Sequence, residues 1–146
     1  MKTRTILAGL IVLAGSSFAA SLAGGGPNFD FLKDDDRKAM QERFNKELWP
    51  LLVRGEKQGC IGCHALPGTG GQMKMSGNTE KDFRLLVKAG FFLPNDSGSM
   101  LSHILSKDRK KRMPPPGKGD PWTMEEIEVL AKFVADLDKK QQKKTK

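Results

Sequence analysis

Residues 60–64 read Cys-Ile-Gly-Cys-His, and they contain both cysteines of the 146-residue chain. If this stretch is helical, the thiols of Cys60 and Cys63 lie on the same side of one turn, because residues three positions apart share a helix face. The imidazole of His64 follows directly. One helical turn therefore presents two thiols and a nitrogen donor to a single bound group, and the rest of the chain has to fold around that group.

The chemistry of these side chains points to a haem. Two thiols at this spacing can add to the two vinyl groups of one haem, and the imidazole after them can bind the iron as the proximal ligand. Cys-x-x-Cys-His is the attachment signature of c-type haem. The sequence predicts one covalent haem c, with thioethers to Cys60 and Cys63 and with His64 on the iron.

Two other kinds of site use similar residues. A redox disulfide of the thioredoxin type needs a βαβ setting, and no stretch of this sequence alternates with the period of a strand. A structural zinc site needs four ligands, and His103 is the one histidine left to join Cys60, Cys63 and His64. The residues between the two histidines show no zinc-finger pattern, so haem attachment is the better interpretation.

The first residues have the layout of a secretory signal peptide. Lys2 and Arg4 precede the apolar run Ile6–Ala14, and small residues follow. We expect a signal peptide at 1–19, with cleavage as late as Ala23 as the alternative. The protein is then periplasmic or otherwise extracytoplasmic, where covalent haem attachment takes place. Cleavage leaves no integral membrane span, whereas an uncleaved segment would act as an anchor.

Helical periodicity and capping signals dominate the remainder, which predicts an all-α fold of about four helices around the one covalent haem. We expect a flexible linker at 20–33, a haem domain at 34–138 and a basic, disordered tail at 139–146. Pro50 should kink or end the first helix. The expected helices begin at Asp34, cover Thr79–Ala89 and Ser99–Ser106, and follow a capping box of Thr123 and Glu126.

The composition sets the size of this fold. With 38% hydrophobic residues, 16 glycines and 8 prolines, the chain can form one domain with a modest core. This excludes a multidomain enzyme, a collagen-like chain and a polytopic membrane protein. The net charge of +8 would allow nucleic acid, an acidic membrane surface or an acidic protein as partner. Given the haem motif, we expect redox proteins with acidic docking surfaces and no nucleic acid.

Four segments between Phe44 and Leu137 form a recognisable set: ELWPLLVRGEKQGCIGCHALPG at 47–68, SMLSHI at 99–104, RMPP at 112–115 and WTMEEI at 122–127. Together they resemble the small single-haem cytochromes c, in particular the planctomycete-type cytochrome c domains. The resemblance implies that 34–138 is a cytochrome c domain, that the protein transfers electrons, and that the methionine of the Met-Pro-Pro loop, here Met113, is the distal iron ligand.

The residues themselves leave the distal ligand open but favour Met113. Basic residues precede it and three prolines follow, so it lies on a stiff loop that can hold a thioether over the iron. The runner-up is His103, which lies opposite Leu101 on a helical wheel and is a surface histidine if that face meets solvent. The remaining sulfur donors lie close after the haem motif or on helices: Met40, Met73, Met75, Met100 and Met124.

Three further predictions are local. The carbonyl of Pro67 could accept the Nδ1 proton of His64, or Leu-Pro-Gly could be an ordinary turn. Trp122 could pack on the haem or donate to a propionate, or it could pack only against the last helix. The charges of Arg109–Arg112 could meet propionates or an acidic partner, or they could form a solvated loop.

The sequence thus predicts an electron carrier rather than an enzyme. No acid–base pair, nucleophile or second metal site is recognisable, and His64 and Met113 together would leave no position on the iron for a substrate. One alternative is a haem-bearing subunit of a larger redox complex, including a complex associated with a membrane. Another is a gas-binding or peroxidase-like haem with a weak or open distal site.

Overall fold

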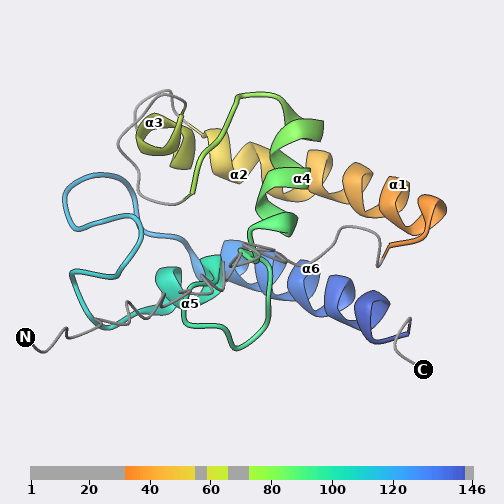
Figure 1. Cartoon of the computed structure of the whole chain (residues 1–146). Coiled ribbons are helices and arrows are strands. Elements are labelled where there is room, and N and C mark those ends of the chain that lie inside the picture. Colours follow the sequence, from red (N-terminus) through yellow and green to blue (C-terminus); the bar gives the residue numbers. More distant parts are fainter. Residues whose placement is uncertain (1–31, 55–58, 66–72, 144–146) are drawn as a thin grey trace, which may run out of the picture.

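The computed structural model describes residues 32–54, 59–65 and 73–143, which form helices joined by turns (Figure 1). Within these ranges β-structure is limited to one isolated bridge between Ala65 and Met75, so the expected all-α class is confirmed there. No described helix combines the length and the apolar character needed to cross a membrane. The elements are α1 (Asp34–Arg43), the π-helical segment η2 (Phe44–Leu48), α2 (Trp49–Val53), α3 (Cys60–His64), α4 (Thr79–Lys88), α5 (Met100–Leu105) and α6 (Met124–Gln142).

The first helix runs without a break through α1, η2 and α2. Its buried face carries Met40, Phe44, Leu48 and Leu52 at four-residue spacing, which forms one apolar stripe. The helix does not end at Pro50. The irregular turn η2 comes immediately before α2, so Pro50 lies in the first turn of α2.

The later helices begin at side-chain caps. Asn78 and Ser99 accept backbone N–H groups at the starts of α4 and α5. At the start of α6 the hydroxyl of Thr123 accepts the N–H of Glu126 at 3.3 Å, and the Glu126 carboxylate accepts the N–H of Thr123 at 2.8 Å. The predicted capping box is confirmed, and α4 and α5 lie within one residue of their expected ends.

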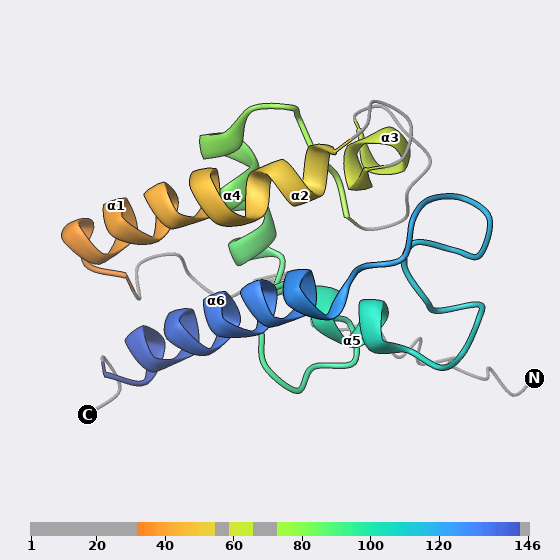
Figure 2. The same cartoon turned by 180° about the vertical axis from the view of Figure 1, so that it is seen from behind.

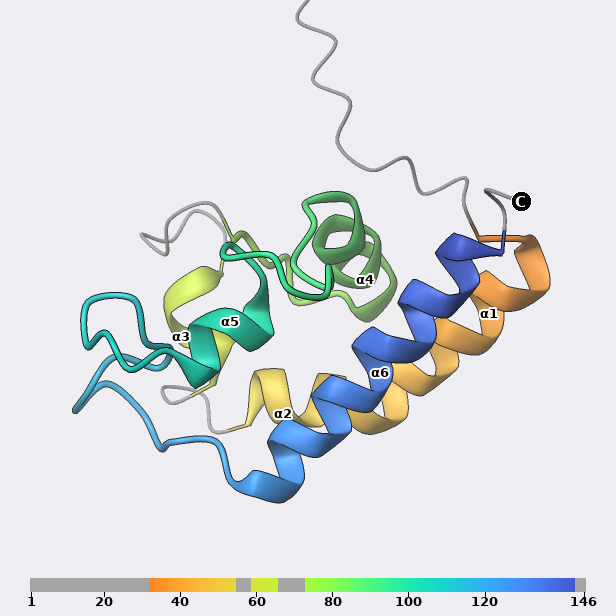
Figure 3. The same ribbon diagram turned by 90° about the horizontal axis from the view of Figure 1, so that it is seen from below.

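Four phenylalanines form the centre of the core. Phe44 of η2 lies 5.3 Å from Phe83 of α4, and Phe92 lies 5.2 Å from Phe133 of α6, measured between ring centroids. All four are buried, and their tilted and edge-to-face arrangements are those that aromatic pairs prefer. Helix α6 lies along α1, as Figures 2 and 3 show from two sides. The contact between Phe44 and Phe133, 6.3 Å between ring centroids, joins η2 to α6.

The folded part extends beyond the expected boundaries 34–138. Leu32, placed in the linker by the sequence, is buried in the core. Residues 139–142, expected in the disordered tail, continue α6, whose last turn is tied to α1 by an ion pair between Lys140 and Asp36. Lysines also interact favourably with the C-terminal end of a helix dipole, which explains why this basic stretch is helical. The signal segment 1–19 and most of the linker lie outside the described residues.

Candidate functional site

A cavity of about 650 Å³ lies between α3, α5 and the loop that leads into α6. Figures 1 and 2 show α3 and α5 on two sides of this region, with the loop at the end of the molecule. Six side chains that the sequence singled out line this cavity: Cys60, Cys63, His64, His103, Met113 and Trp122. The seventh, Pro67, lies outside the described residues. Much of the remaining wall is apolar, from Leu51, Met73, Phe91, Met100, Ile104, Pro114 and Pro115.

Helix α3 meets the end of α2 at a glycine. A Cβ atom at Gly59 would lie 2.8 Å from the carbonyl oxygens of both Leu52 and Arg54, which is closer than real Cβ contacts come. The backbone of Gly59 also accepts the N–H of Gly62 at 3.0 Å in the first turn of α3. The turn that carries both cysteines therefore requires glycine at this position. The sequence analysis missed Gly59, whose only signal was its place directly before Cys60.

The two thiols of α3 differ in their surroundings. Burial raises the pKa of the Cys60 thiol to about 11, whereas Cys63 is exposed. Reactive Cys-x-x-Cys sites lower the pKa of a cysteine so that a thiolate is present at neutral pH. Burial thus disfavours the thiolate form at Cys60, whereas such a reactive site would favour it.

His64 is held by a short strap, Met73–Gly77. Its Nδ1 lies 2.9 Å from the carbonyl oxygen of Met73, and its own carbonyl oxygen accepts the N–H of Met75 at 2.7 Å. Because a carbonyl can only accept, Nδ1 carries the proton and Nε2 has the free lone pair. The sequence suggested Pro67 for this role, and among the described residues the partner is Met73.

The strap is anchored by a buried carboxylate that the sequence analysis missed. Asp82 of α4 has no exposed surface, and it accepts the N–H and the hydroxyl of Ser76 at 2.6 and 2.7 Å and the N–H of Gly77 at 2.9 Å. These bonds satisfy a carboxylate that would otherwise be costly to bury. The signal for Asp82 was an acidic residue beside Phe83 in a helix with a strongly apolar face.

The far wall of the cavity carries both predicted distal candidates. Met113 lies on the loop before α6 with 36% of its surface exposed, and His103 lies on α5 and is half-buried. The face of α5 that carries His103 borders the cavity, so His103 is not the surface histidine that the helical wheel would allow. The structure brings both residues to the same cavity as His64.

The other methionines divide into three groups. Met40 and Met75 are buried in the core away from the cavity lining, and Met124 is 73% exposed. Met73 and Met100 line the cavity but are buried among core residues. Met73 also belongs to the strap that holds His64, so it lies in the same wall of the cavity as His64. Met113 is the methionine of the lining that lies outside the core cluster.

Trp122 lies in the cavity wall immediately before α6. The guanidinium carbon of Arg54 lies 5.6 Å from the centre of its ring, and Arg54 forms an ion pair with Glu126 in the first turn of α6. Cation–π contact and ion pair together hold the indole between α2 and α6. Arg54 also lines the cavity and is a further cationic group that the sequence did not single out.

Among the described residues, no three His, Cys, Asp or Glu side chains are grouped so that they could hold a metal ion by themselves. Comparisons with family models, with curated proteins and with solved structures find no match for this chain. The resemblance to cytochromes c therefore stays an interpretation of the sequence, and the function has to be argued from the cavity.

Proposed function

We propose that this protein is a monohaem c-type cytochrome, similar to the planctomycete-type domains, that carries single electrons between redox proteins outside the cytoplasm. One observation carries the proposal. Both thiols and the histidine of the Cys-x-x-Cys-His motif line the same cavity as His103 and Met113. His103 lies on α5, and Met113 lies on the loop that follows α5. A haem would need one protein ligand on each of its two faces. His64 on α3 and the candidates on α5 and its loop line one cavity, although they lie far apart in the chain.

The cavity fits such a group. Its volume falls within the roughly 300–1,000 Å³ of cofactor sites, and its lining is largely apolar. A porphyrin supplies four nitrogen ligands to its iron, so the protein needs to add only two. This agrees with a site in which no larger cluster of protein ligands is grouped among the described residues. When bound, the haem supplies an iron that changes oxidation state by one electron.

The residues of the chain would have distinct roles. Cys60 and Cys63 hold the haem through thioethers. His64 keeps its Nδ1 proton on the carbonyl of Met73 and offers Nε2 to the iron, and this hydrogen bond fixes the orientation of the ring. Met113 would supply the second protein ligand to the iron. With two protein ligands bound, the iron would have no position left for a substrate, which is why we propose a carrier and not an enzyme.

Covalent attachment is the first test. Full-length protein, produced with export and haem attachment, should have an intact mass under denaturing conditions that exceeds the processed polypeptide by one haem. Acid–acetone extraction should leave the haem on the protein. A matched Cys60→Ser/Cys63→Ser variant should lose the covalent haem. Polypeptide mass alone, with both thiols free to alkylate, would contradict the proposal.

The same sample separates the alternative functions. Absorption spectra of oxidised and reduced protein should show a six-coordinate haem that does not bind carbon monoxide. Rapid carbon monoxide binding in the ferrous state would instead favour a gas-binding or peroxidase-like haem with an open distal site. Co-purification in fixed stoichiometry with larger redox proteins would favour a permanent subunit over a diffusing carrier.

A further inference from the structure

The loop between α5 and α6 is tied to α5 through His103. The Nδ1 atom of His103 lies 2.9 Å from the carbonyl oxygen of Lys111, and the carbonyl oxygen of His103 accepts the N–H of Met113 at 3.1 Å. In the described structure, the other hydrogen bonds of residues 107–112 stay within the loop, where Asp108 is the main acceptor. His103 thus fixes the loop at two points, on either side of Arg112.

Because prolines follow Met113, the hydrogen bond from the Met113 N–H to the His103 carbonyl is the last backbone bond to α5 before the turn at Pro115–Lys118. Residues 114–116 are all proline and have no N–H, so none of them can donate a backbone hydrogen bond. The N–H of Lys118 donates to the carbonyl of Pro115 within the same turn, at 2.9 Å. The position of the Met113 backbone over the cavity therefore depends on its contacts with His103.

The position of His103 is set by the first turn of α5. Its backbone N–H donates to the carbonyl of Ser99 at 3.1 Å, and Ser99 is the buried cap of α5. The partner of the ring is a carbonyl, so Nδ1 is the protonated nitrogen that donates. The hydrogen bond of the ring therefore connects α5 to the loop that carries Met113.

We propose that His103 is a positioning residue that holds Met113 at the distal side, and not itself the iron ligand. The inference rests on the proposed function, because it gives a role to a residue beside a bound haem. The imidazole acts through Nδ1 on the loop backbone and not through Nε2 on the iron. Loss of this hydrogen bond would leave the covalent haem in place but let the Met113 thioether move away.

Replacing His103 by asparagine or by glutamine distinguishes the role of its Nδ1 atom from that of its Nε2 atom. The side-chain nitrogen of asparagine takes the place of Nδ1, whereas that of glutamine takes the place of Nε2. In full-length, haem-loaded protein, His103→Asn should keep the near-infrared band of sulfur-to-iron coordination, and His103→Gln and His103→Leu should weaken it. Lys107→Ala, which shortens an exposed side chain in the same loop, is the matched control and should leave the band unchanged.

Hydrogen exchange gives a second readout that does not depend on activity. The Met113 amide should exchange at least about fivefold faster in His103→Gln and His103→Leu than in wild type, as expected when one hydrogen bond is lost. In His103→Asn the rate should stay within about twofold of wild type. The Phe133 amide in α6 should be unaffected, which separates loosening of the loop from loss of the fold.

The outcomes are distinct. If all three His103 variants lose the wild-type spectrum while Met113→Ala retains it, His103 is the iron ligand and the proposal is wrong. If His103→Gln and His103→Leu match wild type in band and exchange, His103 has no positioning role. If His103→Leu does not fold, the comparison of His103→Asn with His103→Gln still shows whether Nδ1 of His103 positions the loop. Absence of covalent haem from wild type would overturn the proposed function instead, whatever the His103 variants do.

Discussion

His64 and Met113 are held by the fold to very different degrees. His64 has two hydrogen bonds to the strap Met73–Gly77, and the strap is anchored in turn by the buried carboxylate of Asp82. Met113 lies on a partly exposed loop with one backbone tie to α5. If both bind iron, the distal bond is the one that a small change in structure breaks first.

Met113→Ala tests the distal bond directly. The near-infrared band of the ferric protein should disappear, and the reduction potential should fall by on the order of 0.1 V, because a thioether favours ferrous iron more than the water or nitrogen ligand that replaces it. Spectroelectrochemistry measures both. The buried Met75 offers a control, since a Met75→Leu change should preserve the band. A wild-type band in Met113→Ala would assign the distal position to another residue.

Gly59→Ala tests the close approach of α2 and α3. The added methyl would meet two carbonyl oxygens at 2.8 Å, so the backbone has to move, and we expect the free energy of unfolding to fall by about 1–3 kcal/mol. Denaturant titration followed by haem absorbance measures the change. Gly62→Ala, at an exposed position of α3, should stay within about 1 kcal/mol of wild type. Equal effects of the two variants would refute the crowding argument.

At the scale of elements, α1 and α6 are joined along their exposed edges by ion pairs. Arg43 lies 2.8 Å from Asp136 of α6 and 3.0 Å from Glu47, and Lys140 pairs with Asp36. The hydrogen bond from Arg43, with a smaller contribution from Lys139, lowers the pKa of the Asp136 carboxyl. The Arg43 pair lies beside the buried phenylalanine cluster, since the guanidinium carbon of Arg43 is 5.8 Å from the centre of the Phe133 ring.

Stability should depend on pH through Asp136. Because its pKa is lower in the folded state, its contribution is present above the pKa of the unfolded chain, near 4, and is lost as pH falls through the folded pKa. Asp136→Asn should therefore destabilise by less than about 1 kcal/mol at pH 7, given the exposure of the pair, and the difference should vanish at low pH. Denaturant titrations at pH 7 and pH 3 measure this. Glu128→Gln, whose partner Lys132 lies within α6, is the control and should show a smaller difference. A difference for Asp136→Asn that is as large at pH 3 as at pH 7 would contradict the linkage.

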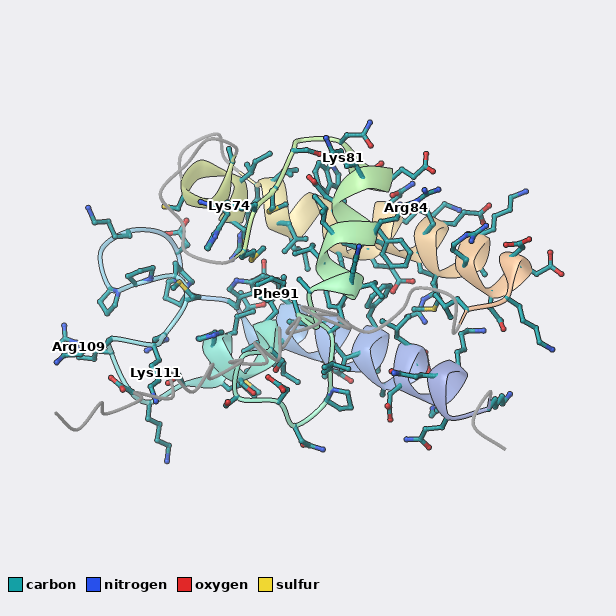
Figure 4. All side chains as sticks on the ribbon, in the orientation of Figure 1. Lys74, Lys81, Arg84, Phe91, Arg109 and Lys111 are labelled. Carbon is teal, nitrogen blue, oxygen red and sulfur yellow. The ribbon has the colours of Figure 1, made fainter. Side chains whose placement is uncertain are left out.

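At the scale of the whole molecule, positive charge gathers at the end that holds the cavity. Arg109 and Lys111 project outward there (Figure 4). The loop between α5 and α6, here called the basic loop, carries six basic side chains: Lys107, Arg109, Lys110, Lys111, Arg112 and Lys118. In the described part of the chain, none of the ion pairs involves any of these six. Many of the acidic side chains of α1 and α6, by contrast, are paired. We propose that an acidic partner docks at the basic loop.

Charge reversal tests this docking. The rate of electron transfer to an acidic redox protein should fall as ionic strength rises, because salt screens attraction between separated charges. Arg109→Glu/Arg112→Glu should slow the reaction by about tenfold or more at low salt and flatten this dependence. Lys38→Glu/Lys46→Glu makes the same change in charge on α1 and η2 and should have a much smaller effect. Equal slowing by the two double variants would show that net charge matters and the basic loop does not.

Features that depend on neighbours in the chain could be predicted from the sequence. Helix caps, apolar periodicity and the Cys-x-x-Cys-His motif each involve residues within a few positions of one another, so the starts of α4, α5 and α6 could be predicted. The end of α6 could not, because residues 139–142 owe their order in part to an ion pair with α1. Similarly, the sequence did not predict the π-helical turn Phe44–Leu48, which comes immediately before the short helix that contains Pro50.

Only the tertiary structure decided which residues meet at the cavity and what holds them there. The sequence could list Met113 and His103 as candidates, but their common position depends on how α5 and its loop pack against the rest of the chain. The requirement for Gly59, the Met73 carbonyl on His64 and the burial of Asp82 are contacts between backbone segments. Such contacts leave little trace in residue type, because every residue carries the same carbonyl group and every residue except proline the same N–H.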